Sequence, residues 1–240
     1  MRYRVPRERV PTFKEFAIRW MRRRVVYEEL LALSHVSLEV GHGEAVGIIG
    51  RNGAGKSTLL KVIARVLRPT DGHVVVRGRV APLLELGAGF DHELTGRENV
   101  YLNGAILGRS RRDMTRRFDR IVDFAELHDF IDAPLRTYST GMIARLGFAV
   151  ATDVEADLLL VDESLSVGDI AFQKKCMDRI HTFIAGGSTL VLVTHSPDLV
   201  RTLCPRAVWL DAGHVAASGR ADDVVAAFIA KTEGAATPGT

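Results

Sequence analysis

A glycine-rich stretch that ends in lysine and serine has the residue types needed to bind phosphate. Residues 50–57 read G-R-N-G-A-G-K-S, which matches the P-loop pattern G-x-x-x-x-G-K-[ST]. Glycines let successive backbone N–H groups converge on phosphate oxygens, because no Cβ stands in the way. Lys56 would reach the β- and γ-phosphates, and Ser57 would bind Mg²⁺. The predicted nucleotide-binding residues are Gly50, Arg51, Asn52, Gly53, Ala54, Gly55, Lys56, Ser57 and Thr58.

Two adjacent carboxylates could complete that site. Residues 158–161 are Leu-Leu-Leu-Val, and Asp162 and Glu163 follow at once. We predict that Asp162 orients the coordination of Mg²⁺ and that Glu163 polarises the attacking water as general base. Taken alone, an apolar run that ends in two acids fits a helix-capping pair equally well, so this prediction depends on the P-loop.

One histidine follows a second apolar run and could sense the terminal phosphate. His195 comes directly after the apolar residues 190–194. A lone histidine is usually structural. At the carboxyl end of a strand in a phosphate-binding α/β fold, however, it would face the crevice where ligands bind. We therefore assign His195 to the catalytic site, together with Glu163.

Strands and helices alternate along the chain and must position these residues. Strands are predicted at 33–40, 45–49, 73–80, 158–161 and 189–193, and a hairpin at 208–217. Helices are predicted at 57–66, 98–132, 141–152 and 222–230. This alternation favours an α/β fold built on a parallel sheet.

The composition is that of a globular protein. Of the 240 residues 47% are hydrophobic and 25% are charged, which excludes extensive disorder and fibrous repeats. The two cysteines exclude a disulfide framework and a cysteine-based zinc site. The start has no apolar segment of the signal-peptide kind, and the longest uncharged stretch, Ile180–Pro197, contains two His and a Gly-Gly pair. We expect a cytosolic protein without a membrane span.

Positive charge is concentrated at the N-terminus. Residues 1–24 contain nine Lys and Arg against two Glu, whereas Asp and Glu outnumber Lys and Arg in the rest of the chain. Phe13, Phe16 and Trp20 lie at helical spacing within this basic segment, which predicts an amphipathic helix at about 12–24. It could bind anionic lipid headgroups or a polar partner, or be a solvated face. Base stacking by these aromatics is less favoured.

Further residues resemble the nucleotide-binding subunits of ABC transporters. The sequence Y-S-T-G-M at 138–142 stands where that family has its Leu-Ser-Gly-Gly-Gln signature, 23 residues before Asp162 when counted from Ser139. Arg145 matches the arginine that usually follows the signature, Asp169 matches the D-loop aspartate, and His195 matches the switch histidine. The resemblance covers about residues 32–230. It implies that a second copy's nucleotide is contacted by Tyr138, Ser139, Thr140, Gly141 and Met142.

Departures from the general family pattern narrow the resemblance to one group of ABC ATPases. Counted back from Glu98-Asn99, the Q-loop position of the family falls near Glu85. No glutamine occupies this position, because Gln173 is the only glutamine in the chain. The runs LLELGAGF…ELTGREN, YSTGM…RL and SVGD…FQKKC look like the ATPase subunits of bacterial polysaccharide exporters, which export O-antigen, capsule, teichoic acid or galactan. The adenine-stacking aromatic is Tyr27 by the usual spacing, or Tyr3 if a helical insertion precedes the strand at 33–40.

The resemblance implies a P-loop NTPase with a RecA-like parallel-sheet core, an antiparallel β subdomain and an α-helical signature subdomain. We expect the ATPase domain at residues 25–230, its helical subdomain at about 92–152, a basic segment at 1–24 and a flexible tail at 231–240.

The implied function is ATP hydrolysis with Mg²⁺ in an exporter of lipid-linked polysaccharide. Two copies of the chain would enclose two ATP molecules and pass their closure to a membrane-spanning subunit, through the Gly87–Leu94 loop and residues 98–132. This places the chain peripherally on the cytoplasmic face of the bacterial cytoplasmic membrane, with no nucleic acid partner. An alternative is a soluble ABC ATPase acting on nucleic acid or ribosomes. A small-molecule kinase would leave residues 138–142 and Asp169 without a role.

Overall fold

The computed structural model describes residues 1–6, 27–84, 86–162 and 168–234. Several expectations therefore lie outside the described residues, namely the amphipathic helix at 12–24, Glu85, Glu163 and residues 235–240 of the tail. No helix within the described ranges is both long enough and apolar enough to cross a membrane.

A six-stranded sheet forms the core and has the order β4-β5-β6-β3-β7-β8. Its strands are β3 (Ala45–Ile49), β4 (Val80–Leu83), β5 (Leu158–Val161), β6 (Thr189–Thr194), β7 (Arg206–Asp211) and β8 (His214–Arg220). All neighbours are parallel except β7 and β8, which form an antiparallel hairpin. The carboxyl ends of β3, β5 and β6 therefore meet at one edge of the sheet, where the chain carries its phosphate-binding and acidic residues.

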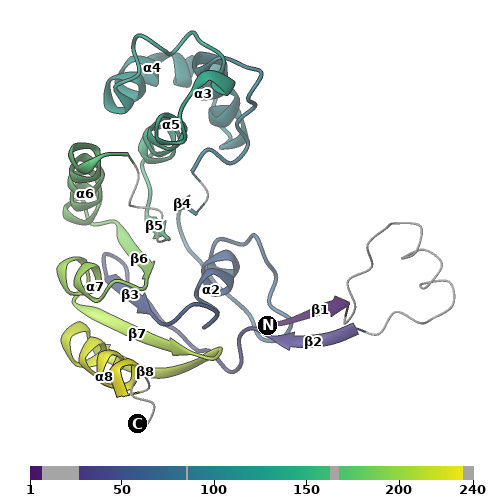
Figure 1. The fold of residues 1–240 in the computed structure, drawn as a ribbon, viewed down its shortest axis with the longest axis vertical. Coiled ribbons are helices and arrows are strands. Elements are labelled where there is room, and N and C mark those ends of the chain that lie inside the picture. Colours follow the sequence, from purple (N-terminus) through teal and green to yellow (C-terminus); the bar gives the residue numbers. More distant parts are fainter. Residues whose placement is uncertain (7–26, 85, 163–167, 235–240) are drawn as a thin grey trace, which may run out of the picture.

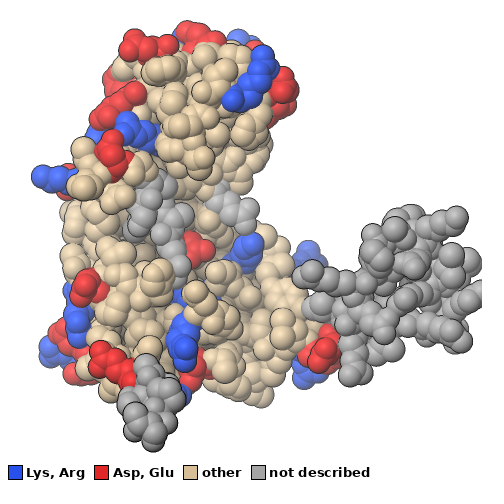
Figure 2. All heavy atoms as spheres, viewed as in Figure 1, with Lys and Arg blue, Asp and Glu red and all other residues tan. Residues whose placement is uncertain are grey.

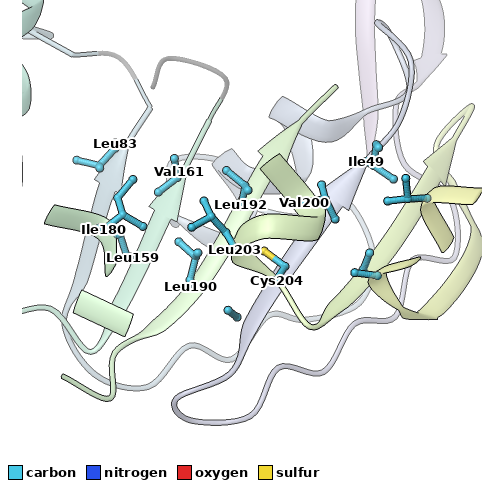
Figure 3. Packing of buried hydrophobic residues seen from close by; sticks show 14 of the residues in the cluster. Ile49, Leu83, Leu159, Val161, Ile180, Leu190, Leu192, Val200, Leu203 and Cys204 are labelled. Carbon is cyan, nitrogen blue, oxygen red and sulfur yellow. The ribbon is translucent and has the colours of Figure 1, made fainter. Parts of the chain in front are cut away.

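Helices cover both faces of the sheet, which is why its central strands are apolar throughout. These helices are α2 (Lys56–Ile63), α6 (Ile170–Ala185), α7 (Pro197–Leu203) and α8 (Ala221–Gly234). Figure 3 shows Leu159 and Leu192 on the face that α6 and α7 cover, beside Ile180 and Leu203. The alternate residues of the same strands pack on the other face with Leu59 and Leu60 of α2.

A cluster of helices lies at the top of Figure 1, and one of its helices also contributes Phe148 to the core of the sheet. It consists of α3 (Gly96–Ile106), α4 (Arg111–Ala125) and α5 (Thr140–Thr152), with the short 3₁₀ helix η1 (Leu135–Thr137) before α5. Its own apolar core includes Val100, Phe118 and Leu146. Figure 2 shows acidic and basic side chains interspersed over its outer surface.

A two-stranded hairpin projects to the right in Figure 1, beside α2. It is formed by β1 (Arg2–Pro6) and β2 (Tyr27–Leu31), which pair in antiparallel fashion with Tyr3 opposite Leu30. The amino group of Met1 donates a hydrogen bond to the carbonyl of Leu33 at 2.6 Å, and this bond ties the hairpin to the body.

Two predicted strands are wrong. Residues 33–40 are all described and form no strand, although their apolar residues alternate in burial as predicted. Val36, Leu38 and Val40 pack against the α2 face of the sheet, so their alternation reflects burial of one face and not a strand. The described residues 73–79 also form no strand, because pairing with β5 begins only at Val80. The helix predicted at 98–132 is two helices separated at Gly108, whose φ is +77°.

Candidate nucleotide-binding site

The P-loop connects the buried strand β3 to the first turn of α2, as the sequence predicts. Two of its glycines are required by their surroundings. A Cβ at Gly50 would overlap the carbonyl oxygen of Leu210, and Gly55 has φ +99° and lies against the carbonyl of Ala32. Gly55 is also the N-cap of α2 and, as a glycine, has no side chain that could accept a hydrogen bond from the helix start. The first N–H groups of α2 therefore face the loop, in an arrangement suited to an anion.

Lys56 is held across the loop before any ligand is added. Lys56 is buried, and only 7% of the residue is exposed. Its Nζ donates hydrogen bonds to the carbonyls of Gly50 at 2.8 Å and Arg51 at 3.1 Å. A buried ammonium group needs such partners, because desolvation of a charge is costly. The positive charge of Lys56 is thus held beside the N-terminus of α2.

A cleft of about 570 Å³ opens in front of the P-loop. It contains the predicted residues Ser57 and Thr58 and also Asp162, which follows β5. Its lining residues are Tyr3, Leu30, Leu31, Ala32, Asn52, Gly53, Gly55, Lys56, Ser57, Thr58 and Asp162. A hydroxyl, a carboxylate, an ammonium group and a helix N-terminus thus share one cavity. This combination can hold a triphosphate together with a cation that prefers oxygen ligands.

The two candidate tyrosines lie at opposite ends of the β1–β2 hairpin. Tyr3 lines the cleft, and its hydroxyl donates to Oγ1 of Thr58 at 3.5 Å. Tyr27 pairs with Pro6, at the end of the hairpin farther from the cleft residues Leu30 and Leu31. The structure therefore brings Tyr3, and with it an apolar wall, to the phosphate-binding residues.

His195 follows β6, which lies between β5 and β3 in the sheet. The end of its strand is therefore flanked by Asp162 after β5 and by Gly50 after β3. Its side chain is exposed, and it does not line the cleft as the described residues define it.

The signature residues lie on the helical cluster, around a separate hollow of about 430 Å³. Ser139 is the N-cap of α5, and its hydroxyl accepts a hydrogen bond from the N–H of Met142 at 3.2 Å. Thr140 begins α5 and is exposed. Tyr138 is buried, and its hydroxyl donates to the carbonyl of Phe130 at 2.6 Å. Gly141 lines the hollow with Ser139 and Met142.

An ion-pair network that sequence reasoning largely missed connects this hollow to α6. Arg145 pairs with Asp169 and, at 3.2 Å, with Glu126, which Lys175 also contacts at 2.7 Å. Asp169 is the N-cap of α6, and a hydrogen bond from the N–H of Phe172, together with the charge of Arg145, lowers the pKa of its carboxyl. Arg145 and Asp169 were predicted because they match positions in the pattern of the ABC family. Nothing in the sequence pointed to Glu126 or Lys175.

Within one chain the two groups of predicted residues stay apart. The cleft at the P-loop and the hollow at Ser139 are lined by different residues, with none in common. This separation agrees with the family resemblance, which assigned residues 138–142 to the nucleotide of a second copy.

A phosphate loop between a buried parallel strand and a helix, with a carboxylate at the end of a nearby strand, is typical of a P-loop NTPase. The sequence profile of the ABC transporter family matches residues 33–166. The chain belongs to the ABC transporter family, and it is an ATPase of that type.

Relatives and solved structures agree with this assignment. The O-antigen export system ATP-binding protein RfbB of Klebsiella pneumoniae is 50% identical over 195 residues, which are 81% of this chain and 79% of that protein. The teichoic acids export ATP-binding protein TagH of Bacillus cereus is 42% identical over 197 residues, 82% of this chain and 36% of that protein. A dimeric ATP-binding cassette, solved in a post-hydrolysis state with ADP and Pi, gives a TM-score of 0.70 at 26% identity, covering 81% of this chain and 92% of that one.

Proposed function

We propose that this chain is the ATP-hydrolysing subunit of an exporter that moves lipid-linked polysaccharide across the bacterial cytoplasmic membrane. The observation that carries the proposal is the 50% identity to an O-antigen export ATP-binding protein over 81% of the chain. Identity to a teichoic acid export protein supports the same class of cargo and leaves the individual polymer open.

In this proposal the cleft supplies the groups that bind ATP and Mg²⁺. The N–H groups of the P-loop and Lys56 bind the phosphates, and Ser57 and Asp162 offer oxygen ligands to Mg²⁺. No group of three or more His, Cys, Asp or Glu gathers as a metal site among the described residues. This fits Mg²⁺, which is usually held by one or two protein oxygens together with substrate phosphates. A bound Mg²⁺ would supply positive charge at the phosphates, while Glu163 would polarise the attacking water and His195 would sense the terminal phosphate.

Two copies of the chain complete each site. Because the Ser139 hollow and the P-loop cleft are separate in one copy, the signature of one copy meets the nucleotide bound by its partner. The resemblance to a dimeric cassette supports this arrangement. The γ-phosphate then accepts charge-assisted hydrogen bonds from both copies, and hydrolysis removes them.

The exporter also needs a membrane-spanning subunit. We assign its contact surface to the Gly87–Leu94 loop and helices α3 and α4, and the chain to the cytoplasmic face of the membrane. The basic segment 1–24 provides charge that favours an anionic lipid surface.

Co-purification distinguishes the proposed export function from the alternative of a soluble ABC ATPase that acts on nucleic acid or ribosomes. The full chain is co-expressed with the membrane-spanning subunit of a polysaccharide exporter. We expect the two to co-purify, and loss of the chain to leave lipid-linked polymer on the cytoplasmic side. Absence of co-purification, together with ATPase stimulation by DNA or ribosomes, would instead support a soluble ABC ATPase.

Tyr3 is the residue on which we expect the adenine to stack. Tyr3→Ala should weaken ATP binding about tenfold, because stacking on an aromatic is worth roughly 1–3 kcal/mol per base. Isothermal titration with ATP measures this loss. Tyr27→Ala is the matched control and should bind ATP normally, whereas weaker binding only in that variant would reverse the assignment.

A further inference from the structure

One polar side chain in the helical cluster is completely buried. Asn99 on α3 is 0% exposed, and its amide makes four hydrogen bonds. Its Nδ2 donates to the carbonyls of Asp91 at 2.8 Å, Thr95 at 2.9 Å and Leu94 at 3.3 Å, and its Oδ1 accepts from the N–H of Asp91 at 2.7 Å. All four bonds fix the backbone at 91–95. A buried amide placed in this way determines the conformation of that segment.

The same backbone segment is bonded to the chain that leads into the signature. The N–H of Leu135 donates to the carbonyl of Leu94 at 2.9 Å, and the N–H of Arg136 donates to the carbonyl of His92 at 3.0 Å. The Arg136 side chain also pairs with Glu93 at 2.6 Å. Residues 91–95 and 131–136 are therefore joined by backbone bonds as well as by an ion pair, directly before the signature.

The first signature residue rests on the start of α3. Tyr138 lies so close to Gly96 that a Cβ there would overlap the tyrosine hydroxyl. That hydroxyl donates to the carbonyl of Phe130 in the segment preceding η1. The position of Tyr138 is thus set by the same turn that Asn99 fixes, because Thr95 is the N-cap of α3 and Gly96 its first residue.

The other end of this loop reaches the phosphate side of the sheet. Gly87 packs against α5, where a Cβ at Gly147 would lie 2.5 Å from the Gly87 nitrogen. The carbonyl of Leu83, the last residue of β4, accepts from the N–H of Asp162 at 3.4 Å. The chain from Leu83 to Thr95 therefore connects the cleft carboxylate with the support of the signature.

We propose that Asn99 is a positioning residue for ATP hydrolysis. It holds the turn at 91–95 so that Tyr138 and Ser139 lie in register to meet the partner's nucleotide. The inference rests on the proposed function, since the signature acts only across the pair of copies. Asn99 does not touch ATP, so its removal alters the assembly of the site and not the binding of nucleotide to the P-loop.

The variant Asn99→Ala tests whether assembly of the catalytic site can be impaired while nucleotide binding to the P-loop is retained. We expect kcat for ATP hydrolysis to fall roughly 10- to 100-fold, as small misplacements of a supporting group can cause. The affinity of the P-loop cleft for ATP should stay within twofold, because Lys56 and its loop lie elsewhere. Phosphate release measures kcat, and equilibrium titration with ATP measures the affinity.

The matched control weakens the same helical cluster at a distance from the turn. Asp153 caps the other end of α5 and pairs with Arg117 at 3.3 Å and Arg120 at 2.6 Å. Asp153→Asn should lower thermal stability and leave kcat near the wild-type value. If both variants lost kcat in proportion to their melting temperatures, Asn99 would have only a structural role and the proposal would be wrong.

A second variant tests the proposal if Asn99→Ala folds poorly. Gly96→Ala pushes directly on Tyr138 and should show the same fall in kcat at unchanged ATP affinity. A normal kcat in a folded Gly96→Ala protein would overturn the inference. The parent chain is assayed alongside with hydrolysis blocked by Glu163→Gln. A parent that stays monomeric with ATP would refute the proposed dimer itself, and a dimerising parent with a fully active Asn99→Ala variant would refute only the positioning role.

Discussion

Lys56→Met is expected to lower kcat/KM for ATP hydrolysis about 10²–10³-fold, the range seen when one preorganised donor to developing charge is removed. Methionine keeps a similar length and removes the charge. In the structure Nζ is already directed across the loop by the carbonyls of Gly50 and Arg51. The triphosphate therefore meets a fixed cation at a helix N-terminus, and little reorganisation is needed when it binds. Phosphate release over a range of ATP concentrations gives the effect.

Loss of Lys56 has a second consequence in the ligand-free protein. The buried carbonyl of Gly50 loses the donor Nζ, which costs about 1–3 kcal/mol for an unsatisfied group, whereas the carbonyl of Arg51 still accepts from the N–H of Ala54 at 3.1 Å. The variant should therefore also unfold at lower temperature. Lys61→Met is the control, because Lys61 lies on the same helix but does not line the cleft. Hydrolysis by Lys56→Met within tenfold of the wild type would contradict the assignment of the P-loop.

The parts of the fold that can be predicted from sequence are those in which local pattern and tertiary environment agree. β3 and β5 are short apolar runs bounded by polar residues, and both are buried strands. The P-loop follows from its glycine spacing, because only glycine fits at Gly50 and Gly55. Residues 33–40 show the limit of this reasoning. Alternating apolar residues indicate one buried face, but they do not indicate whether another backbone supplies hydrogen bonds.

The parts that could not be predicted depend on contacts between distant segments. Nothing in the local sequence distinguishes Tyr3 from Tyr27, and only the register of the β1–β2 hairpin brings Tyr3 to the cleft. Asn99 lies in an otherwise ordinary helical stretch. Its importance appears only when residues 91–95 and 131–136 are seen to share hydrogen bonds.

Glu163→Gln is expected to slow ATP hydrolysis about 10²–10³-fold, within the range for loss of a general base. Asp162, which lines the cleft, directly precedes it. Glutamine keeps nearly the same shape but cannot accept the proton of the attacking water. Because binding groups remain, ATP should hold two copies together. Glu155→Gln is the control, since Glu155 precedes the same strand, is exposed and pairs with Arg79 at 3.3 Å away from the cleft.

The same variant tests the dimer as well as the base. Size-exclusion chromatography of Glu163→Gln with ATP and Mg²⁺ should show a dimer that returns to monomer when nucleotide is withdrawn. Adding Ser139→Ala should abolish that dimer, because it removes the hydroxyl that caps α5 and faces the signature hollow. Normal turnover by Glu163→Gln would exclude Glu163 as base. A dimer that persists in the double variant would instead mean that the signature does not join the two copies, because its Ser139 hydroxyl would then be dispensable for ATP-dependent association.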